Sequence, residues 1–99
     1  MKYEYAEYAT QKALEVLAID SPTGYTQKAA KWLLEQLREL GFSATQTNKG
    51  GVIADLGGTG DPLMLSAHID TLGGMVAEIK GNGRLRISQL GGLAANACD

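Results

Sequence analysis

The chain has 99 residues, 44% of them hydrophobic, which suffices for one compact domain and makes a second independent domain unexpected. Nine Lys and Arg residues stand against eleven Asp and Glu residues, and the formal net charge of -2 lacks the basic surplus typical of nucleic-acid-binding proteins. Cys98 is the single cysteine and His68 the single histidine, which excludes an intramolecular disulfide framework and a zinc cluster built from Cys and His.

Two amphipathic helices are predicted in the first half of the chain. Apolar and small residues recur at intervals of three and four over residues 3–17, and Pro22 and Gly24 mark the end of this pattern. A second helix is predicted over residues 26–40, with Gly41 as its C-terminal cap. Trp32 lies beside the apolar stripe of this helix, where a large aromatic side chain usually serves packing.

The sequence indicates neither export nor membrane insertion. Residues 1–17 carry acidic side chains and lack the uninterrupted apolar core of a secretory signal. The longest clean apolar run, residues 62–67, falls far short of the roughly 20 residues that span a bilayer. Together with the lone cysteine, these features predict a cytoplasmic protein that does not associate with membranes.

Strands are predicted after Gly41, where the pattern becomes alternating or continuously apolar: residues 42–47, 52–56 and 63–68. Turn residues separate them at 48–51 and 57–62. The glycine-rich second turn is not a phosphate-binding loop, because no Gly-Lys-Ser/Thr follows and the next element is a strand. Since residues 63–67 are almost continuously apolar, the third strand is predicted to be covered on both faces at the centre of the sheet.

A last hairpin is predicted over residues 75–90, closed by the three-residue loop 81–83 with a glycine bulge. A two-residue loop would instead set Ile79 against Arg86. The three-residue loop is favoured because it pairs side chains of matching character: Ile79 with Leu85, Ala77 with Ile87, and Glu78 with Arg86. Residues 93–99 complete no predicted element, so the chain is expected to be part of a longer one.

His68 and Asp70 are the residues with the strongest chemical potential. They stand two apart at the end of the predicted central strand, so both side chains project to the same side. Open sheets build their sites at the carboxyl ends of strands. A histidine that ligates a metal generally donates its other ring hydrogen to a carboxylate or carbonyl. By spacing alone the pair fits either a metal ligand with its supporting carboxylate or a local hydrogen-bonded pair.

A series of motifs around this pair resembles one peptidase family. Residues 65–73 (LSAHIDTLG), followed by residues 75–76 (MV) and 79–85 (IKGNGRL), resemble the first metal-site segment of the M42 metallo-aminopeptidases. Residues 91–92 (GG) stand where that family has a Gly-Gly pair. Residues 21–25 (SPTGY) and 40–42 (LGF) resemble the start shared with the M20 peptidases, which with M28 form the related co-catalytic zinc peptidases. The resemblance extends from the first helix to Gly92.

The resemblance implies an α/β fold, in which two N-terminal helices pack on a mixed β-sheet of a three-layer-type metallopeptidase. Residues 1–72 would be the N-terminal part of the catalytic domain, and residues 73–99 the incomplete start of an inserted β-barrel domain that serves dimerisation or assembly. His68 would bind one of two zinc or cobalt ions, and Asp70 would orient His68. The implied enzyme is a homo-oligomer that removes N-terminal residues from peptides by metal-activated water.

The other ligands of that family have no counterpart in this sequence. The family also uses a bridging Asp, a general-base Glu beside a metal-binding Glu, a further carboxylate and a second His. Four acidic residues match none of these positions: Asp55, Asp61, Glu78 and Asp99. The 99 residues are therefore expected to be an N-terminal portion without peptidase activity of its own. Two alternatives remain open, a truncated non-catalytic interaction or oligomerisation module and a piece without a separate role.

Two other activities fit the sequence poorly. Cys98 could act as a nucleophile only with a base such as His68, but it lies in an unpatterned segment without an oxyanion motif, so an incidental free thiol is the favoured interpretation. A glycosidase needs two carboxylates that face each other in one cleft, and no spacing of the acidic residues points to such a pair.

Overall fold

The computed structural model describes residues 2–98, and the side chains from residue 4 onward. The elements follow in the order α1 (Lys2–Leu17), α2 (Gln27–Glu39), β1 (Ser43–Gln46), β2 (Val52–Asp55), β3 (Gly73–Ile79), β4 (Leu85–Leu90) and a short 3-10 helix (Ala95–Ala97). The strands form two separate antiparallel sheets, β1 with β2 and β3 with β4. This is an α/β fold, and both predicted helices and four of the five predicted strands are present.

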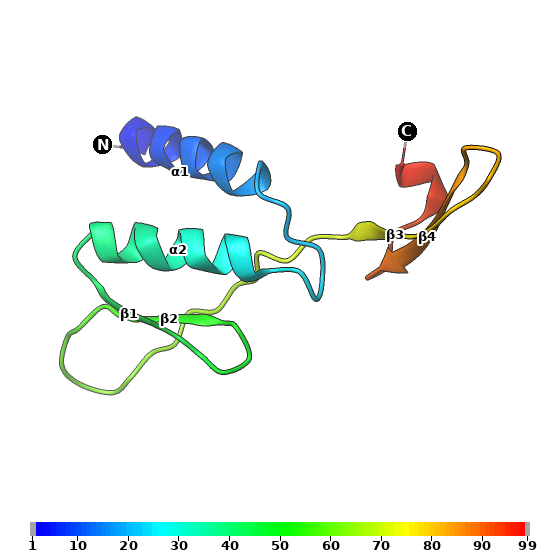
Figure 1. Ribbon diagram of the computed structural model, residues 1–99. Coiled ribbons are helices and arrows are strands. Elements are labelled where there is room, and N and C mark those ends of the chain that lie inside the picture. Colours follow the sequence, from blue (N-terminus) through cyan, green and yellow to red (C-terminus); the bar gives the residue numbers. More distant parts are fainter. Residues whose placement is uncertain (1, 99) are drawn as a thin grey trace.

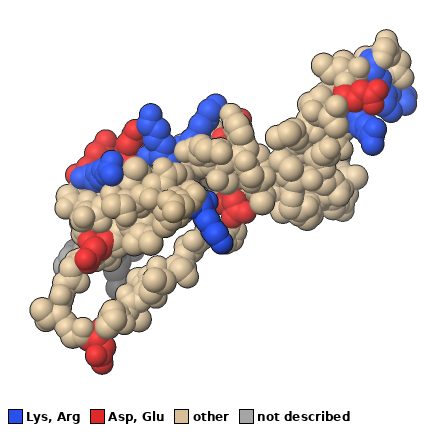
Figure 2. Space-filling view, turned by 60° about the horizontal axis from the view of Figure 1, so that its bottom comes forward, with Lys and Arg blue, Asp and Glu red and all other residues tan. Residues whose placement is uncertain are grey.

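Helix α2 lies between α1 and the β1–β2 hairpin, while the β3–β4 hairpin projects from the far end (Figure 1). The molecule measures 61 × 35 × 22 Å, with a radius of gyration of 17.6 Å. A compact domain of this size has a radius of gyration of roughly 13 Å. Figure 2 shows the projecting hairpin as a separate lobe. Because the molecule is elongated, few of its described residues are buried.

The small interior lies between α2 and β1. Ala29, Ala30 and Ala44 are the buried apolar residues among those described, and their small side chains let the helix approach the hairpin closely. The total accessible surface is 8468 Å², against roughly 5,400 Å² for a compact monomer of the same mass. Most large apolar side chains therefore remain in contact with solvent.

Gly41 ends α2 and turns the chain into β1. Its φ of 89° is in the left-handed region that favours glycine. The amide of Gly41 donates to the Arg38 carbonyl at 2.9 Å, and that of Phe42 donates to the Leu37 carbonyl at 3.1 Å, which is the Schellman pattern. The Arg38 guanidinium donates to the Ala44 carbonyl at 3.1 and 3.2 Å. The predicted cap at Gly41 is confirmed, and it aligns β1 with the helix.

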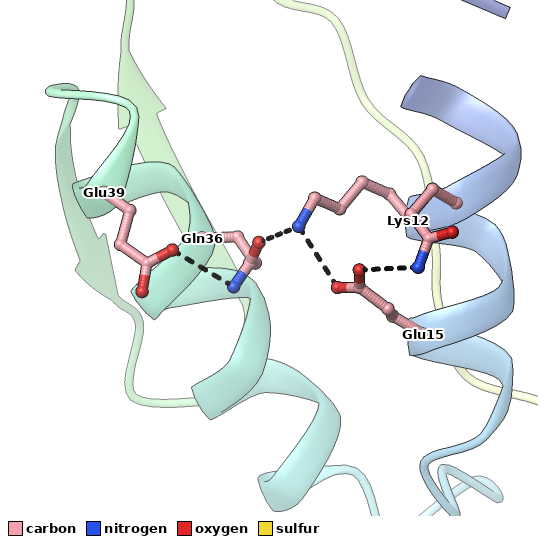
Figure 3. Close-up of polar contacts among 5 residues, drawn as sticks. Lys12, Glu15, Gln36 and Glu39 are labelled. Atoms are coloured by element: carbon pink, nitrogen blue, oxygen red, sulfur yellow. Dashed lines mark hydrogen bonds and ion pairs between the residues drawn. The ribbon is translucent and has the colours of Figure 1, made fainter. Parts of the chain in front are cut away.

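Helices α1 and α2 meet through one lysine. Lys12 Nζ donates to Gln36 Oε1 on α2 and, at 3.1 Å, to Glu15 Oε2 on its own helix (Figure 3). The same ammonium group lies 5.9 Å from the ring centroid of half-buried Trp32. This side-chain bridge joins α1 to α2. No helix of residues 2–98 has the length and apolarity to cross a membrane.

The predicted central strand over residues 63–68 is wrong. These residues pair with no strand among the described residues, and Leu63, Met64 and Leu65 are 82–86% exposed. A continuous apolar run becomes a buried strand only where neighbouring elements cover both faces, and residues 2–98 provide none there. The expected mixed sheet is accordingly absent from the described chain, in which parallel pairing is limited to one bridge between Pro22 and Thr71.

The β3–β4 hairpin confirms the predicted loop but not the whole register. The Lys80 amide donates to the Arg84 carbonyl at 2.8 Å, the Gly83 amide donates to the Lys80 carbonyl at 3.0 Å, and Gly83 has a φ of 82°. Ile79 faces Leu85 and Glu78 faces Arg86, as predicted. The predicted Ala77–Ile87 pair is wrong, because a bulge between Val76 and Glu78 places Val76 opposite Ile87. The bulge thereby pairs two β-branched side chains, which pack better across strands than alanine does.

Replacing Leu65 by lysine tests the exposure of the 63–65 run. Because Leu65 is solvent-exposed, Leu65→Lys should change the free energy of unfolding by less than about 0.5 kcal/mol in urea denaturation followed by circular dichroism. The matched substitution Ala30→Lys at a buried position should abolish cooperative unfolding. A loss of several kcal/mol in Leu65→Lys would mean that the run is buried after all.

The Lys12 bridge predicts a pH effect at Glu15. Hydrogen bonds from Lys12 and then Gln11 lower the pKa of Glu15 below its ordinary value. The ionised carboxylate therefore stabilises the fold above that ordinary pKa, and the contribution is lost as pH falls through the lowered pKa. In a side-chain carboxyl NMR titration, Lys12→Met should raise the pKa of Glu15. Lys31→Met removes the separate pair with Glu35 and should leave the pKa of Glu15 unchanged.

Candidate functional site

His68 and Asp70 lie at the end of the extended 63–70 segment, just before β3. They border an open cavity of about 380 Å³. One other wall is the loop before α2, with Thr23, Gly24 and Thr26, together with Ala30 and Leu33 of α2. Another is the turn between β1 and β2, residues 49–51, with the first residue of β2. The cavity thus brings together three segments that are distant in the sequence.

The structure brings His68 and Asp70 into direct contact. His68 Nδ1 lies 3.0 Å from Asp70 Oδ1 and 3.2 Å from the Asp70 carbonyl oxygen. Both partners are acceptors, so the tautomer that satisfies them carries its hydrogen on Nδ1 and leaves a lone pair on Nε2. The His68 side chain is 83% exposed and the Asp70 side chain 41%. Nε2 is the ring atom left to bind an electrophile from solvent.

A third residue completes the contact around Asp70. Thr23 Oγ1 donates to Asp70 Oδ2 at 3.1 Å, so each carboxylate oxygen has its own partner. The sequence pattern does not reveal this residue, because residues 21–25 have the features of a helix stop and of a family motif. The two residues are 47 positions apart, and no local pattern reports a contact over that distance.

The loop that carries Thr23 is anchored on both sides of Asp70. Ser21 is 2% exposed, and its Oγ donates to the Ile69 carbonyl at 2.9 Å. The Thr71 amide donates to the Ser21 carbonyl at 2.8 Å, and the Thr23 amide donates to the Thr71 carbonyl at 3.3 Å. These three bonds clamp the neighbours of Asp70 to residues 21–23.

Gly73 permits this close approach. A Cβ at position 73 would lie 2.6 Å from Pro22 Cβ, which no side chain tolerates without movement of the backbone. Glycine therefore lets the start of β3 come close enough to Pro22 for the parallel bridge between Pro22 and Thr71. The absence of a side chain at position 73 thus helps to place Thr23 beside Asp70.

The described residues include one candidate metal ligand, His68, with a supporting carboxylate, Asp70. Among them, no group of three or more His, Cys, Asp or Glu side chains could hold an ion. Asp55 caps the backbone amide of Gly57 at 2.8 Å, and Glu78 stands opposite Arg86 in the hairpin. Asp61 lies in the exposed turn, and Asp99 lies outside the described residues. A nitrogen ligand with a supporting carboxylate fits zinc or cobalt chemistry, and a complete site would need further ligands beside these two residues.

Cys98 is a free, exposed cysteine. Its Sγ lies 3.7 Å from the Ala94 carbonyl, within the last turn of the chain. The sulfur therefore has a local backbone partner and not a histidine base, which agrees with an incidental thiol.

The comparisons identify the class of protein. A family model described as "M42 glutamyl aminopeptidase" matches residues 50–99. "Putative aminopeptidase YhfE" of Bacillus subtilis (strain 168) is 42% identical over 87 residues, which cover 86% of this chain and 25% of that protein. "Putative LysW-lysine/LysW-ornithine hydrolase" of Pyrococcus abyssi (strain GE5 / Orsay) is 36% identical over 85 residues, 82% of this chain and 25% of that protein.

"Putative aminopeptidase" of Acetivibrio thermocellus is 30% identical over 76 residues, 77% of this chain and 23% of that protein. These similarities place the chain in a family of peptidases, a class of hydrolases. Within that class, it belongs to the M42 glutamyl aminopeptidase family. The chain spans about a quarter of the length of the curated relatives that it matches.

Ser21→Ala tests the clamp around Asp70. Loss of the hydroxyl removes the bond to the Ile69 carbonyl, worth about 1 kcal/mol, and should speed hydrogen exchange of the neighbouring Thr71 amide about fivefold. Ser43 is exposed at the start of β1, so Ser43→Ala should leave the Thr71 amide unaffected. Equal exchange in Ser21→Ala and the wild type would show that the hydroxyl does not hold this segment.

Proposed function

We propose that these residues form part of a dinuclear metal-dependent aminopeptidase that hydrolyses N-terminal residues from peptides. The observation that carries the proposal is the His68–Asp70 contact at the edge of the cavity, in a chain of the M42 family. In this proposal His68 binds one of two zinc or cobalt ions through Nε2, and Asp70 holds the imidazole. The two ions would polarise the scissile carbonyl and activate a water for attack.

Asp70 serves this role by selecting a tautomer. With Oδ1 of Asp70 on Nδ1, the hydrogen stays on that side of the ring and Nε2 presents its lone pair. The carboxylate also raises the electron density of the imidazole, which strengthens a metal bond. The exposure of His68 keeps Nε2 accessible to ligands that other segments contribute.

The 99 residues by themselves are proposed to be inactive. A zinc ion in a catalytic site takes three protein ligands and a water, whereas residues 2–98 supply one imidazole. We propose that residues 1–72 belong to the three-layer catalytic domain with its mixed sheet. Residues 73–99 would begin the inserted β-barrel for assembly into a homo-oligomer, because β3–β4 projects from the helices with exposed Val76 and Ile87 (Figure 1). The complete enzyme would act on peptides in the cytoplasm.

A second candidate function is a non-catalytic interaction module of the same family. The exposed run Leu63–Met64–Leu65 favours it, since an extended apolar segment without strand partners can pair with another chain. Sedimentation of the 99-residue chain tests this second candidate. The module should self-associate at micromolar concentration, and a chain that stays monomeric at high concentration would exclude self-association through this run.

His68→Ala in the full-length protein that carries these residues tests the metal assignment. Removal of the ligand should lower the bound metal from two ions to about one per chain, measured by elemental analysis, and reduce kcat/KM at least about 100-fold. Asp61→Asn changes a charge in the exposed turn and should leave both quantities unaffected. The 99-residue chain with added zinc should hydrolyse no peptide. Full metal content and activity in His68→Ala would refute the assignment.

A further inference from the structure

We propose that Thr23 is a positioning residue, which holds the Asp70 carboxylate in the orientation that selects the His68 tautomer with a free Nε2. The proposal rests on the proposed function, because that tautomer matters only if Nε2 binds a metal. It adds a residue from outside the His-x-Asp motif, on a loop that precedes α2. Thr23 donates to Asp70 and would act through that carboxylate.

A fixed orientation of the Asp70 carboxylate needs a second hydrogen-bond partner beside His68. The carboxylate is 41% exposed, so water competes for its oxygens and the group can rotate about its Cβ–Cγ bond. Oδ1 lies 3.0 Å from His68 Nδ1 and Oδ2 lies 3.1 Å from Thr23 Oγ1, so each oxygen has its own partner. A carboxylate held at one oxygen only would swing away from the imidazole more often.

The backbone keeps Thr23 at the right distance. The bonds from Thr23 to Thr71 and from Thr71 to Ser21 set the loop in register with the residues on each side of Asp70. The buried Ser21 hydroxyl adds a third bond to the Ile69 carbonyl. The threonine hydroxyl is thus carried on a fixed backbone, and this distinguishes it from a chance surface contact.

The single histidine makes the tautomer measurable without assignment. In the 99-residue chain, two-dimensional ¹H–¹⁵N spectra of the imidazole at alkaline pH report the ratio of the Nδ1–H to the Nε2–H form. The wild type should favour Nδ1–H, whereas free histidine favours the opposite form. Thr23→Val keeps the shape but removes the donor, and the ratio should fall by at least about threefold.

Three further variants control the measurement. Thr23→Ser keeps the hydroxyl and should retain the wild-type ratio. Thr59→Val removes a hydroxyl in the exposed turn and should also retain it. Gly73→Ala pushes the Pro22 loop away and should lower the ratio as Thr23→Val does, although the Thr23 hydroxyl is intact.

The outcomes distinguish this inference from the proposed function. An Nδ1–H wild type with an unchanged ratio in Thr23→Val would overturn the role of Thr23 and leave Asp70 as the orienting group. A wild-type ratio equal to that of free histidine would overturn both. A lowered ratio in Thr23→Val together with its recovery in Thr23→Ser supports the positioning role, which loss of packing would not produce.

Discussion

The close approach of residues 21–23 to residues 69–73 is the contact on which the rest of the arrangement depends. The two segments are almost fifty positions apart, and their hydrogen bonds join the helical part of the molecule to the approach of the second hairpin. Gly73 makes the approach possible, because any side chain there would collide with Pro22. The same hydrogen bonds hold the residues on both sides of Asp70, so one contact supports both the fold and the candidate site.

Local regularity explains which elements could be predicted from the sequence. Helical spacing identified both helices, and the glycine after the second one identified its Schellman ending. Residues 63–67 have the pattern of a buried strand, but burial depends on neighbours that the pattern cannot supply, and residues 2–98 do not supply them. The bulge in β3 was missed for a related reason, since side-chain matching alone does not reveal an extra residue in one strand.

In the candidate site, too, local contacts can be predicted from the sequence and tertiary contacts cannot. His68 and Asp70 are two positions apart, so the geometry of an extended chain brings them together and the sequence suffices to pair them. Thr23 reaches Asp70 only through the tertiary contact of its loop, and nothing in residues 21–25 marks them as its partner. Membership of the M42 family accounts for the ordered motifs, while the roles proposed for His68, Asp70 and Thr23 rest on the distances between them.

The exposed Leu63–Met64–Leu65 run also affects the tendency of the chain to aggregate during folding. An exposed, uncharged apolar run favours strand pairing with other chains during folding. Asp61 and Pro62 stand directly before it, one supplying charge and the other a residue that cannot donate to a growing ladder. Both residues lie on the N-terminal side of the run, where they disfavour its pairing with strands of other chains. The turn after β2 thereby limits aggregation in addition to connecting two segments.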